Sequence, residues 1–589
     1  MTEAIKKHYW TALAVSVLLC TLVAIGAFCA RTQPHTDEVW SYMLSNKYDS
    51  PFLYALCPGV GVEIENVDGF ILSLQKYFNH WHDGKYYRDA LTVQPGEQFA
   101  YGRVYHNQSL DVHPPLYYYL LHTICSFFPN QFSWWFAFSI NLMFYIGSMV
   151  LIFVIGNALG MEKSRSLLAS MFWGLSSAGI YEVCFLRMYM MMTFIMLCVT
   201  YLNILISRSF NVKYVAITYL LCTLGELTHY YAYIYIFFIT LFCVIYLFNR
   251  REYKHGILYG LAILLSVATA VTFYPVFLKQ MFSGIYGDYI ANGYANIGLA
   301  LSLFNMIHLV LQSYTGINIL SLRHVLTSIL IISYLLHLLA LLHRALKQDS
   351  VSSSYFERLR EIWHFVLRTD RHYLNTLFRK IGDSSWKLIL FSLLTSSFVI
   401  ANFSTSGMGV FTIRYMFAVL PLFSIFMVHY TEMLLFYIFA NKKNRASYQL
   451  LVMSTLCAIG VFGSYLSSGE SNFLHKNDSM ASDYRRYFEN SDIVLVDKTN
   501  YAQAFTPWLM NSNKVFPTGD INSYVSTILS NYKDTRLYLI VSSSLSNYGK
   551  PEIDCYLSTV VPGRYSYVGT CYCSTNNSNN YLFYQIKGK

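Results

Sequence analysis

The chain has 589 residues, of which 55% are hydrophobic and only 13% are charged. A soluble globular domain usually carries about 25% charged residues, so this composition excludes a disordered chain, a fibrous repeat and an ordinary soluble enzyme. The net charge of +10 would suit a nucleic-acid-binding protein, but the Lys and Arg residues lie mostly in short loops between apolar runs, where they indicate membrane topology. The sequence therefore predicts a polytopic α-helical membrane protein.

The first apolar run extends to about Ala30 and follows Lys6 and Lys7. No small-residue cleavage signature ends this run, so we interpret it as a membrane anchor rather than a removed signal peptide. The two lysines place the N-terminus in the cytoplasm, since basic residues stay on the inner side of the membrane. Residues 31–133 would then form a first extracytoplasmic loop with juxtamembrane helices.

About ten further spans are predicted from runs of roughly 20 apolar residues. They cover residues 134–159, 166–186, 188–207, 214–230, 231–248, 257–278, 321–343, 387–405, 412–438 and 447–466. With about eleven spans in all, the basic loops 162–165, 208–213, 249–254, 344–387 and 441–445 all fall inside.

This topology requires the apolar stretch 114–129 to be a juxtamembrane or interfacial helix, because a further span there would move the basic loops outside. The stretch 297–320 is ambiguous and fits a re-entrant segment. The loop 344–387 mixes basic and aromatic residues, so both an amphipathic helix on anionic lipid and a solvated linker fit it.

The character of the chain changes at about residue 467, where Asn and Ser become frequent. Residues 492–496, 536–541 and 581–586 are short apolar runs typical of buried strands. We predict a small extracytoplasmic α/β domain over 467–589, following a transmembrane catalytic domain over 1–466. The C-terminal domain shows no glycine-rich phosphate loop or nucleophile elbow, so a role in covering the site or binding an acceptor is expected.

Five polar clusters fall on the outer side of this topology. They are His35 to Trp40 with the adjacent Asp37 and Glu38, Asp111 to Tyr119 with His113 before a Pro-Pro pair, Tyr181 to Tyr189 with Arg187, Thr228 to Tyr231 with His229, and Arg414-Tyr415. Each has a plain structural interpretation: solvated acids, a helix cap, a snorkelling arginine or a packed histidine. Their convergence on one face predicts a polar pocket that suits the head group of a phosphate-bearing lipid.

In this order, the clusters resemble the membrane-embedded GT-C glycosyltransferases. The bacterial branch of glycosyltransferase family 39 is most similar, and the dolichyl-phosphate-mannose protein mannosyltransferases and the lipid A aminoarabinose transferase are related families. The resemblance covers about residues 10–430 and implies a GT-C fold; the C-terminal domain has no counterpart in it. It implies a polyprenyl-phosphate sugar donor, a glycan, lipid or protein acceptor, and no nucleic acid.

The resemblance also implies residue roles. It makes Asp37 the general base and Glu38 its support. Donor binding falls to His113, Arg187, Tyr189 and Arg414, and the substrate pocket to Asp111, His229, Tyr230 and Tyr415. Two departures from the family concern charge: Phe185 stands where many relatives have Glu, and 136–138 has no Arg. The cation that holds the phosphate is therefore left open among Arg187, Arg414 and His113.

We expect an inverting hexosyltransferase of the cell envelope, since one base and one displacement invert the anomeric carbon. No cofactor or obligatory metal is expected, although a divalent cation would bind if Asp37, Glu38, Asp111, His35 and His113 converged. The alternatives are a lipid-linked glycan ligase or polymerase, a lipid or sugar transporter, and a non-catalytic scaffold. Transporters often contain internal repeats, and we find none here.

Overall fold

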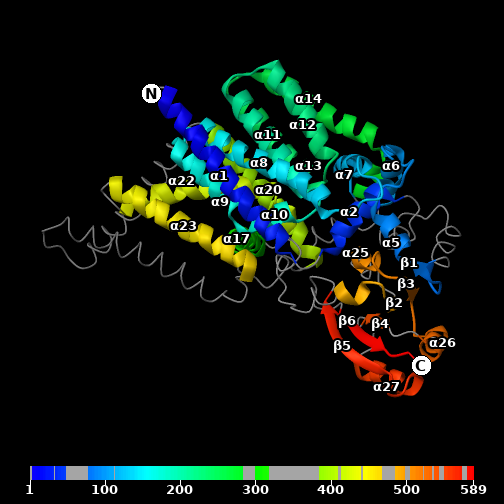
Figure 1. Ribbon diagram of the computed structural model, residues 1–589. Coiled ribbons are helices and arrows are strands. Elements are labelled where there is room, and N and C mark those ends of the chain that lie inside the picture. Colours follow the sequence, from blue (N-terminus) through cyan, green and yellow to red (C-terminus); the bar gives the residue numbers. More distant parts are fainter. Residues whose placement is uncertain are drawn as a thin grey trace.

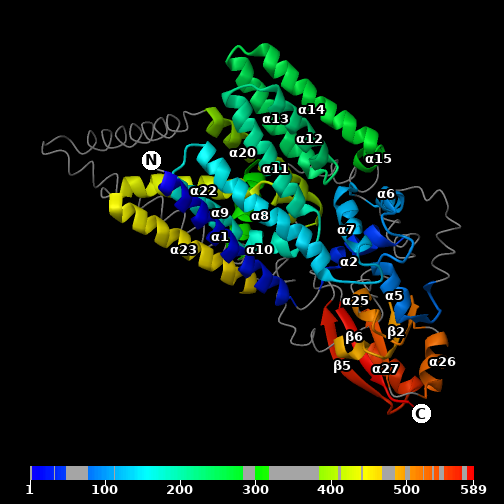
Figure 2. The same cartoon turned by 45° about the horizontal axis from the view of Figure 1, so that its top comes forward.

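The computed structural model describes residues 3–31, 34–47, 77–111, 113–282, 299–316, 384–408, 413–438, 442–466, 485–497, 505–521, 523–533, 536–542, 550–572 and 580–588. Within these ranges the apolar helices form one bundle, and the strands form a single sheet at one end of it (Figure 1). Short helices of the first loop, residues 31–133, lie between the bundle and the sheet in both Figure 1 and Figure 2.

Among the described residues, five helices are long and apolar enough to cross a membrane. They lie in α1 (Glu3–Cys29), α8 (Trp134–Ala158), α11 (Tyr189–Arg208), α13 (Tyr231–Asn249) and α14 (Tyr253–Phe273). Shorter apolar segments lie in α20 (Ser384–Met408), α22 (Leu420–Ile438) and α23 (Lys442–Leu466). The protein is therefore a helical integral membrane protein, whereas the total of about eleven spans stays a prediction.

The predicted span 166–186 is broken in the structure. It consists of α9 (Lys163–Gly174) and α10 (Ser177–Cys184), which are bent by 57° relative to one another. Ser176 begins α10 by accepting a hydrogen bond from the backbone of Gly179 at 3.0 Å. A Cβ on Gly179 would lie 2.3 Å from the carbonyl oxygen of Trp173, so the tight bend requires glycine there. The end of α10 contacts the first loop, where Arg31 donates to the carbonyl oxygen of Cys184.

The other predicted spans have mixed outcomes. The helix α12 (Val212–Glu226) has 15 residues, or about 22 Å at 1.5 Å per residue, and is shorter than the predicted 214–230. The predicted 412–438 is divided into α21 (Ile413–Met416) and α22. The predicted juxtamembrane helix is α7 (Leu116–Ser126), whose 11 residues are too few to cross a bilayer. The ambiguous stretch contains α17 (Leu299–Thr315); residues 321–343 and 344–383 lie outside the described ranges.

The C-terminal domain contains the strands that the sequence predicts. They are β2 (Asp492–Val496), β4 (Leu537–Ser542) and β6 (Asn580–Ile586), and the sheet also includes β3 (Lys514–Thr518) and β5 (Tyr565–Tyr572). Strands β3, β2 and β4 are parallel, whereas β6 and β5 are antiparallel additions. One face of the sheet packs on α26 (Ser523–Asn531) and α27 (Lys550–Val560); the other, with α25 (Thr506–Leu509), joins the main hydrophobic core.

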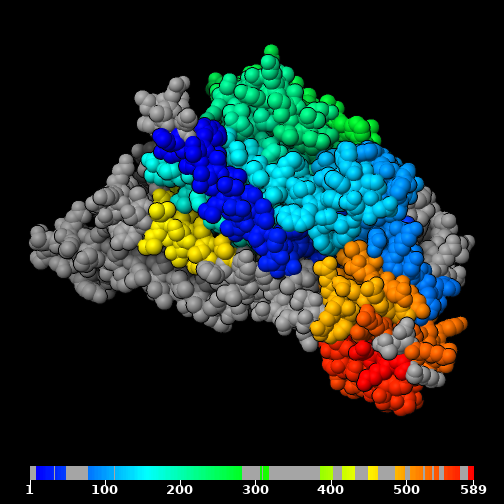
Figure 3. Space-filling model, in the orientation of Figure 1, coloured from blue at the N-terminus to red at the C-terminus, as the bar shows by residue number. Residues whose placement is uncertain are grey.

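The first loop supplies the sixth strand of this sheet. Residues His82–Asp83 form β1, which pairs antiparallel with β3, so that His82 lies opposite Val515. The next helix, α5 (Gly84–Leu91), begins with a glycine whose Cβ would lie 2.4 Å from the carbonyl oxygen of Ser512. The C-terminal domain and the first loop therefore form one packed unit, and the two are in contact in Figure 3.

Candidate active site

The segment after the first span is shaped by the cap of α2 (Thr36–Asn46). His35 is the N-cap residue: its Nδ1 accepts a hydrogen bond from the backbone of Asp37 at 3.1 Å. Glu38 completes the capping box, because its Oε2 accepts a hydrogen bond from the backbone N–H of His35 at 2.8 Å. The sequence His-Thr-Asp-Glu therefore begins the helix and fixes both carboxylates in its first turn.

Glu38 is fully buried and every contact it makes is structural. Its carboxylate forms an ion pair with Arg31, and its Oε1 accepts from the backbone of Leu186 at 2.9 Å. Arg31 in turn donates to the carbonyl oxygen of Cys184 at 2.8 Å. Glu38 thus ties α2 to the end of α10. The resemblance implies that Glu38 supports catalysis, and its partner Arg31 was not among the predicted site residues, although Arg31 directly follows the first span.

Asp37, one residue earlier, faces a different environment. Its Oδ2 accepts a hydrogen bond from Nη1 of Arg414 at 2.6 Å, which joins residues 377 positions apart. The side chain of Asp37 is 32% exposed, against 13% for Arg414. The structure therefore brings together the predicted base and one of the predicted phosphate-binding cations.

The charges around Asp37 keep it ionised. Burial alone would raise the pKa of the carboxyl, but His35, Arg414 and Arg187 outweigh it and hold the pKa below its usual range. Burial also lowers the pKa of His35 to about 4, so this ring is neutral near pH 7. Its Nδ1 is already occupied as an acceptor, which fits the neutral form. At neutral pH the two arginines are therefore the groups that hold Asp37 as an anion.

Arg187 is the third arginine of the site, and it is only 4% exposed. One of its nitrogens, Nη1, donates to the carbonyl oxygen of Asp37 at 3.2 Å and lies 3.5 Å from Oγ of Ser41. Its guanidinium lies 5.9 Å from the ring centre of Tyr118. In the described part of the chain, Arg187 has no carboxylate within ion-pair distance.

His113 links Arg187 to a further acid. Its Nδ1 lies 3.1 Å from Oδ2 of Asp111 and 3.4 Å from Nη2 of Arg187. One ring nitrogen does not donate and accept at once, so we assign the proton to Nδ1 and the hydrogen bond to the closer Asp111. Burial lowers the pKa of His113 against the opposing effect of Asp111. The contact with Arg187 is then not a hydrogen bond.

Aromatic rings form the remaining side of the cluster. The rings of Tyr231 and Tyr415 stack with centroids 4.5 Å apart, and Tyr189 lies 5.2 Å from His229. His229 also lies 5.5 Å from His113. These contacts bring four of the predicted clusters together.

Tyr230 contacts a different part of the structure. It packs on Phe277 of α15 (Val276–Phe282), and its hydroxyl donates to Gln280. The amide of Gln280 also donates to the backbone carbonyl of Asp111. Tyr230 therefore supports, through Gln280, the segment that carries His113.

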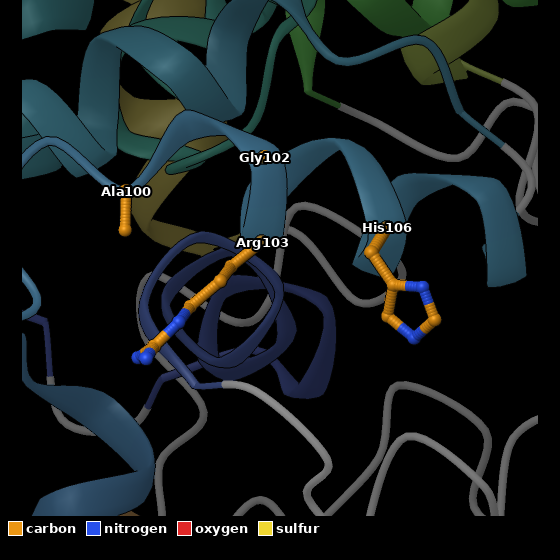
Figure 4. Close-up of a pocket in the computed structure, with 4 residues that line it drawn as sticks. All are labelled: Ala100, Gly102, Arg103 and His106. Carbon is orange, nitrogen blue, oxygen red and sulfur yellow. The ribbon is translucent and has the colours of Figure 1, made fainter.

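A pocket of about 430 Å³ opens on α6 (Tyr101–Leu110), lined by Ala100, Gly102, Arg103 and His106. Arg103 and His106 extend to the same side of the helix (Figure 4). None of these residues belongs to the cluster around Asp37, so we do not assign the chemistry to this pocket. Within the described ranges, no group of three or more His, Cys, Asp or Glu side chains is placed to hold a metal ion.

Neither a protein-family model nor a curated protein sequence matches the chain. Among solved structures, it is similar to the crystal structure of ArnT from Cupriavidus metallidurans in the apo state, with 11% sequence identity and a TM-score of 0.37. The match covers 86% of this chain and 94% of the other. This likeness is remote, and the function proposed below therefore rests on the residues of the cluster.

Proposed function

We propose that the protein is an inverting glycosyltransferase that moves a sugar from a polyprenyl-phosphate donor to an acceptor hydroxyl at the outer membrane boundary. The observation that supports it most directly is Arg187, a buried cation without a carboxylate partner among the described residues, next to the ionised Asp37. Burying a charge without a counter-ion is costly. A site of this kind favours an anionic substrate, and its position at the end of the bundle favours a lipid-linked one.

In the proposed reaction, the acceptor oxygen attacks the anomeric carbon of the donor while Asp37 takes the hydroxyl proton. The bond between that carbon and the phosphate oxygen breaks, and its electron pair leaves with the lipid phosphate. The products are the glycosylated acceptor and the polyprenyl phosphate. A single displacement through an oxocarbenium-like transition state inverts the configuration of the anomeric carbon.

In this reaction the arginines would stabilise the negative charges of the leaving phosphate and of Asp37. The leaving phosphate gains negative charge in the transition state, and a fixed buried cation stabilises it there more effectively than water does. Arg414 orients the carboxylate of Asp37 at 2.6 Å and keeps it ionised. The Arg31–Glu38 pair would position Asp37 indirectly, because it holds the first turn of α2 against the end of α10.

The sidedness of the site belongs to the same proposal. The basic residues of loops 162–165, 208–213 and 249–254 favour the cytoplasmic side. That orientation places the N-terminus inside, and the cluster and the C-terminal domain outside.

The test is turnover by the purified protein in detergent with defined prenyl-phosphate hexoses, measured as release of prenyl phosphate. The variant Asp37→Asn keeps the size of the side chain and removes the base, so we expect a loss of about 10²–10⁴-fold. Binding of the donor should persist, because the phosphate contacts remain.

Asp554→Asn is a matched control. Asp554 is 34% exposed and pairs with Lys550 at 3.2 Å, much as Asp37 pairs with Arg414, but it lies on α27 in the C-terminal domain. Its loss should leave turnover unchanged. Undiminished release of prenyl phosphate by Asp37→Asn would rule out Asp37 as the base.

The alternative functions predict other results in two measurements. One is native mass spectrometry of the protein with its bound lipid, and the other is uptake of the donor into vesicles. A lipid that carries one hexose-sized unit supports the transferase. A lipid that carries a long glycan supports a ligase or polymerase, and uptake of the donor into vesicles without cleavage supports a transporter.

A further inference from the structure

Three buried polar groups near Arg187 and His113 have no hydrogen-bond partner in the described structure. They are Nε of Arg187, Nε2 of His229 and the hydroxyl of Tyr118. Tyr118 is fully buried, His229 is 1% exposed and Arg187 is 4% exposed. Buried polar groups are nearly always paired in folded proteins, so three such groups in one cluster indicate a binding site for a hydrogen-bond acceptor.

The hydrogen bonding of His229 determines which of its ring nitrogens donates. Its Nδ1 accepts the backbone hydrogen of Tyr231 at 3.0 Å, so in the neutral ring the proton lies on Nε2. Burial first, and then the charges of His113, Arg187 and Arg414, lower the pKa of His229 well below its usual value. The ring therefore stays neutral near pH 7 and offers one N–H.

The charges of the cluster point to the kind of acceptor. Arg31 and Arg414 are each paired with a carboxylate, Glu38 and Asp37 respectively. Arg187 is not paired in this way within the described ranges, and its guanidinium lies beside Tyr118 and His113. An acceptor that satisfies a guanidinium, an imidazole N–H and a hydroxyl together is an anion with several oxygens, such as a phosphate.

We propose that Arg187, His229 and Tyr118 form the binding site for the phosphate group of the lipid donor, whereas Arg414 serves Asp37. The inference rests on the proposed function and deepens it, because it assigns separate tasks to two cations that the sequence left as alternatives. The two cations already contact different parts of Asp37: Arg187 donates to its backbone carbonyl oxygen, and Arg414 donates to its carboxylate.

The experiment measures binding of a sugar-free polyprenyl phosphate to the full-length protein in detergent, by native mass spectrometry titration. His229→Phe keeps a ring for the contacts with Tyr189 and removes the N–H. A hydrogen bond to a charged group contributes enough to affinity that its loss should weaken binding about tenfold or more. Arg187→Gln should weaken it further, and Tyr118→Phe somewhat less.

Conservative and control variants separate binding from folding. His229→Gln retains a side-chain N–H donor and should recover much of the affinity that His229→Phe loses. Tyr235→Phe removes a fully buried hydroxyl that is already paired with Thr200 at 2.6 Å, and it should bind as the wild type does. Arg414→Gln should bind polyprenyl phosphate within about twofold of the wild type, a small change on the affinity scale, while its turnover falls.

The outcomes distinguish the two proposals. If the wild type binds no polyprenyl phosphate, the glycosyltransferase proposal itself fails. If the wild type binds and both His229→Phe and Arg187→Gln bind equally well, the assignment of the phosphate site is wrong and the function stands. Loss of affinity only in Arg414→Gln would place the phosphate on Arg414. Competition by inorganic phosphate as strong as by the lipid would make this a site for free phosphate and overturn the lipid assignment.

Discussion

The two ends of α2 are held by different chemistry. At its start, the Arg31–Glu38 ion pair and the hydrogen bond from Leu186 join it to the membrane bundle. At its end, neutral side-chain amides join it to the rest of the first loop: Asn46 donates to the carbonyl oxygen of Leu91 at 2.8 Å, and Asn107 donates to that of Leu44 at 2.9 Å. A buried charge with all its partners in place resists movement more strongly than single amide contacts do.

Asp37 lies in the same turn as Glu38 but has the opposite character. Its side chain is about a third exposed and its Oδ2 has a single cationic partner, whereas Glu38 is fully buried and accepts from a guanidinium and two backbone amides. The comparison shows how two adjacent acids differ: Glu38 fixes the helix, and Asp37 stays partly exposed. Three variants test this difference, beginning with the largest expected effect.

Glu38→Ala should be the most damaging change to the fold. It leaves the buried guanidinium of Arg31 without its counter-ion, and breaking a buried pair in this way costs about 3–5 kcal/mol. We expect a large loss of thermal stability in detergent and loss of turnover with it. Thermal unfolding followed by intrinsic fluorescence is the measurement, and an unfolding temperature equal to that of the wild type would show that the ion pair does not hold α2.

Asn107→Ala should have an intermediate effect. The side chain donates to the carbonyl oxygens of Leu44 and Lys47 at the end of α2, and it is 1% exposed. Leaving buried carbonyls unpaired costs about 1–3 kcal/mol, so the unfolding temperature should fall less than in Glu38→Ala. The paired control is Asn513→Ala, which removes a partly buried amide bonded to Asp492 in the C-terminal domain. If Asn107→Ala lowered the unfolding temperature more than Glu38→Ala does, the end of α2 would be held more strongly than its start.

Arg414→Gln should produce the smallest effect on the fold and a change in pH dependence. The groups that face Asp37 are His35, His113, Arg187 and Arg414, and the cations hold its pKa below the usual range. In the wild type, turnover should therefore show no acid limb from Asp37 near neutral pH. Without Arg414, burial raises this pKa, so the acid limb should move to higher pH.

The pH dependence of turnover, measured across the acid range, tests this shift. Arg414→Lys keeps the charge and should retain the wild-type profile. An acid limb at the same pH in wild type and Arg414→Gln would show that Arg414 does not control the ionisation of Asp37.

The sequence predicted the elements whose patterns are local. Long apolar runs identify α8, α11 and α13, and short apolar runs identify β2, β4 and β6. The break between α9 and α10 was not predicted, because the apolar content continues through it and only the packing of Gly179 against Trp173 shows the bend. The edge strand β1 was also missed, since two residues, His82 and Asp83, carry no periodic signal.

For the site, the sequence supplied the residue types but not their pairing. Asp37, Arg187, His113 and Arg414 were all named as candidates, yet the partner of Asp37 lies 377 residues away. Only the fold decides which arginine meets which acid. The catalytic and binding roles of these residues stay predictions that the variants above test.

The pairing of β1 with β3 has a consequence for the order in which the chain assembles. Val515 leaves the ribosome more than four hundred residues after its partner His82, by which time the membrane helices have been synthesised. Contacts between such distant segments form late in folding. Until then the edge of β3 lacks its neighbour, and an open edge invites pairing with other chains. The first loop thus covers the open edge of β3 only late in assembly, when β1 pairs with it.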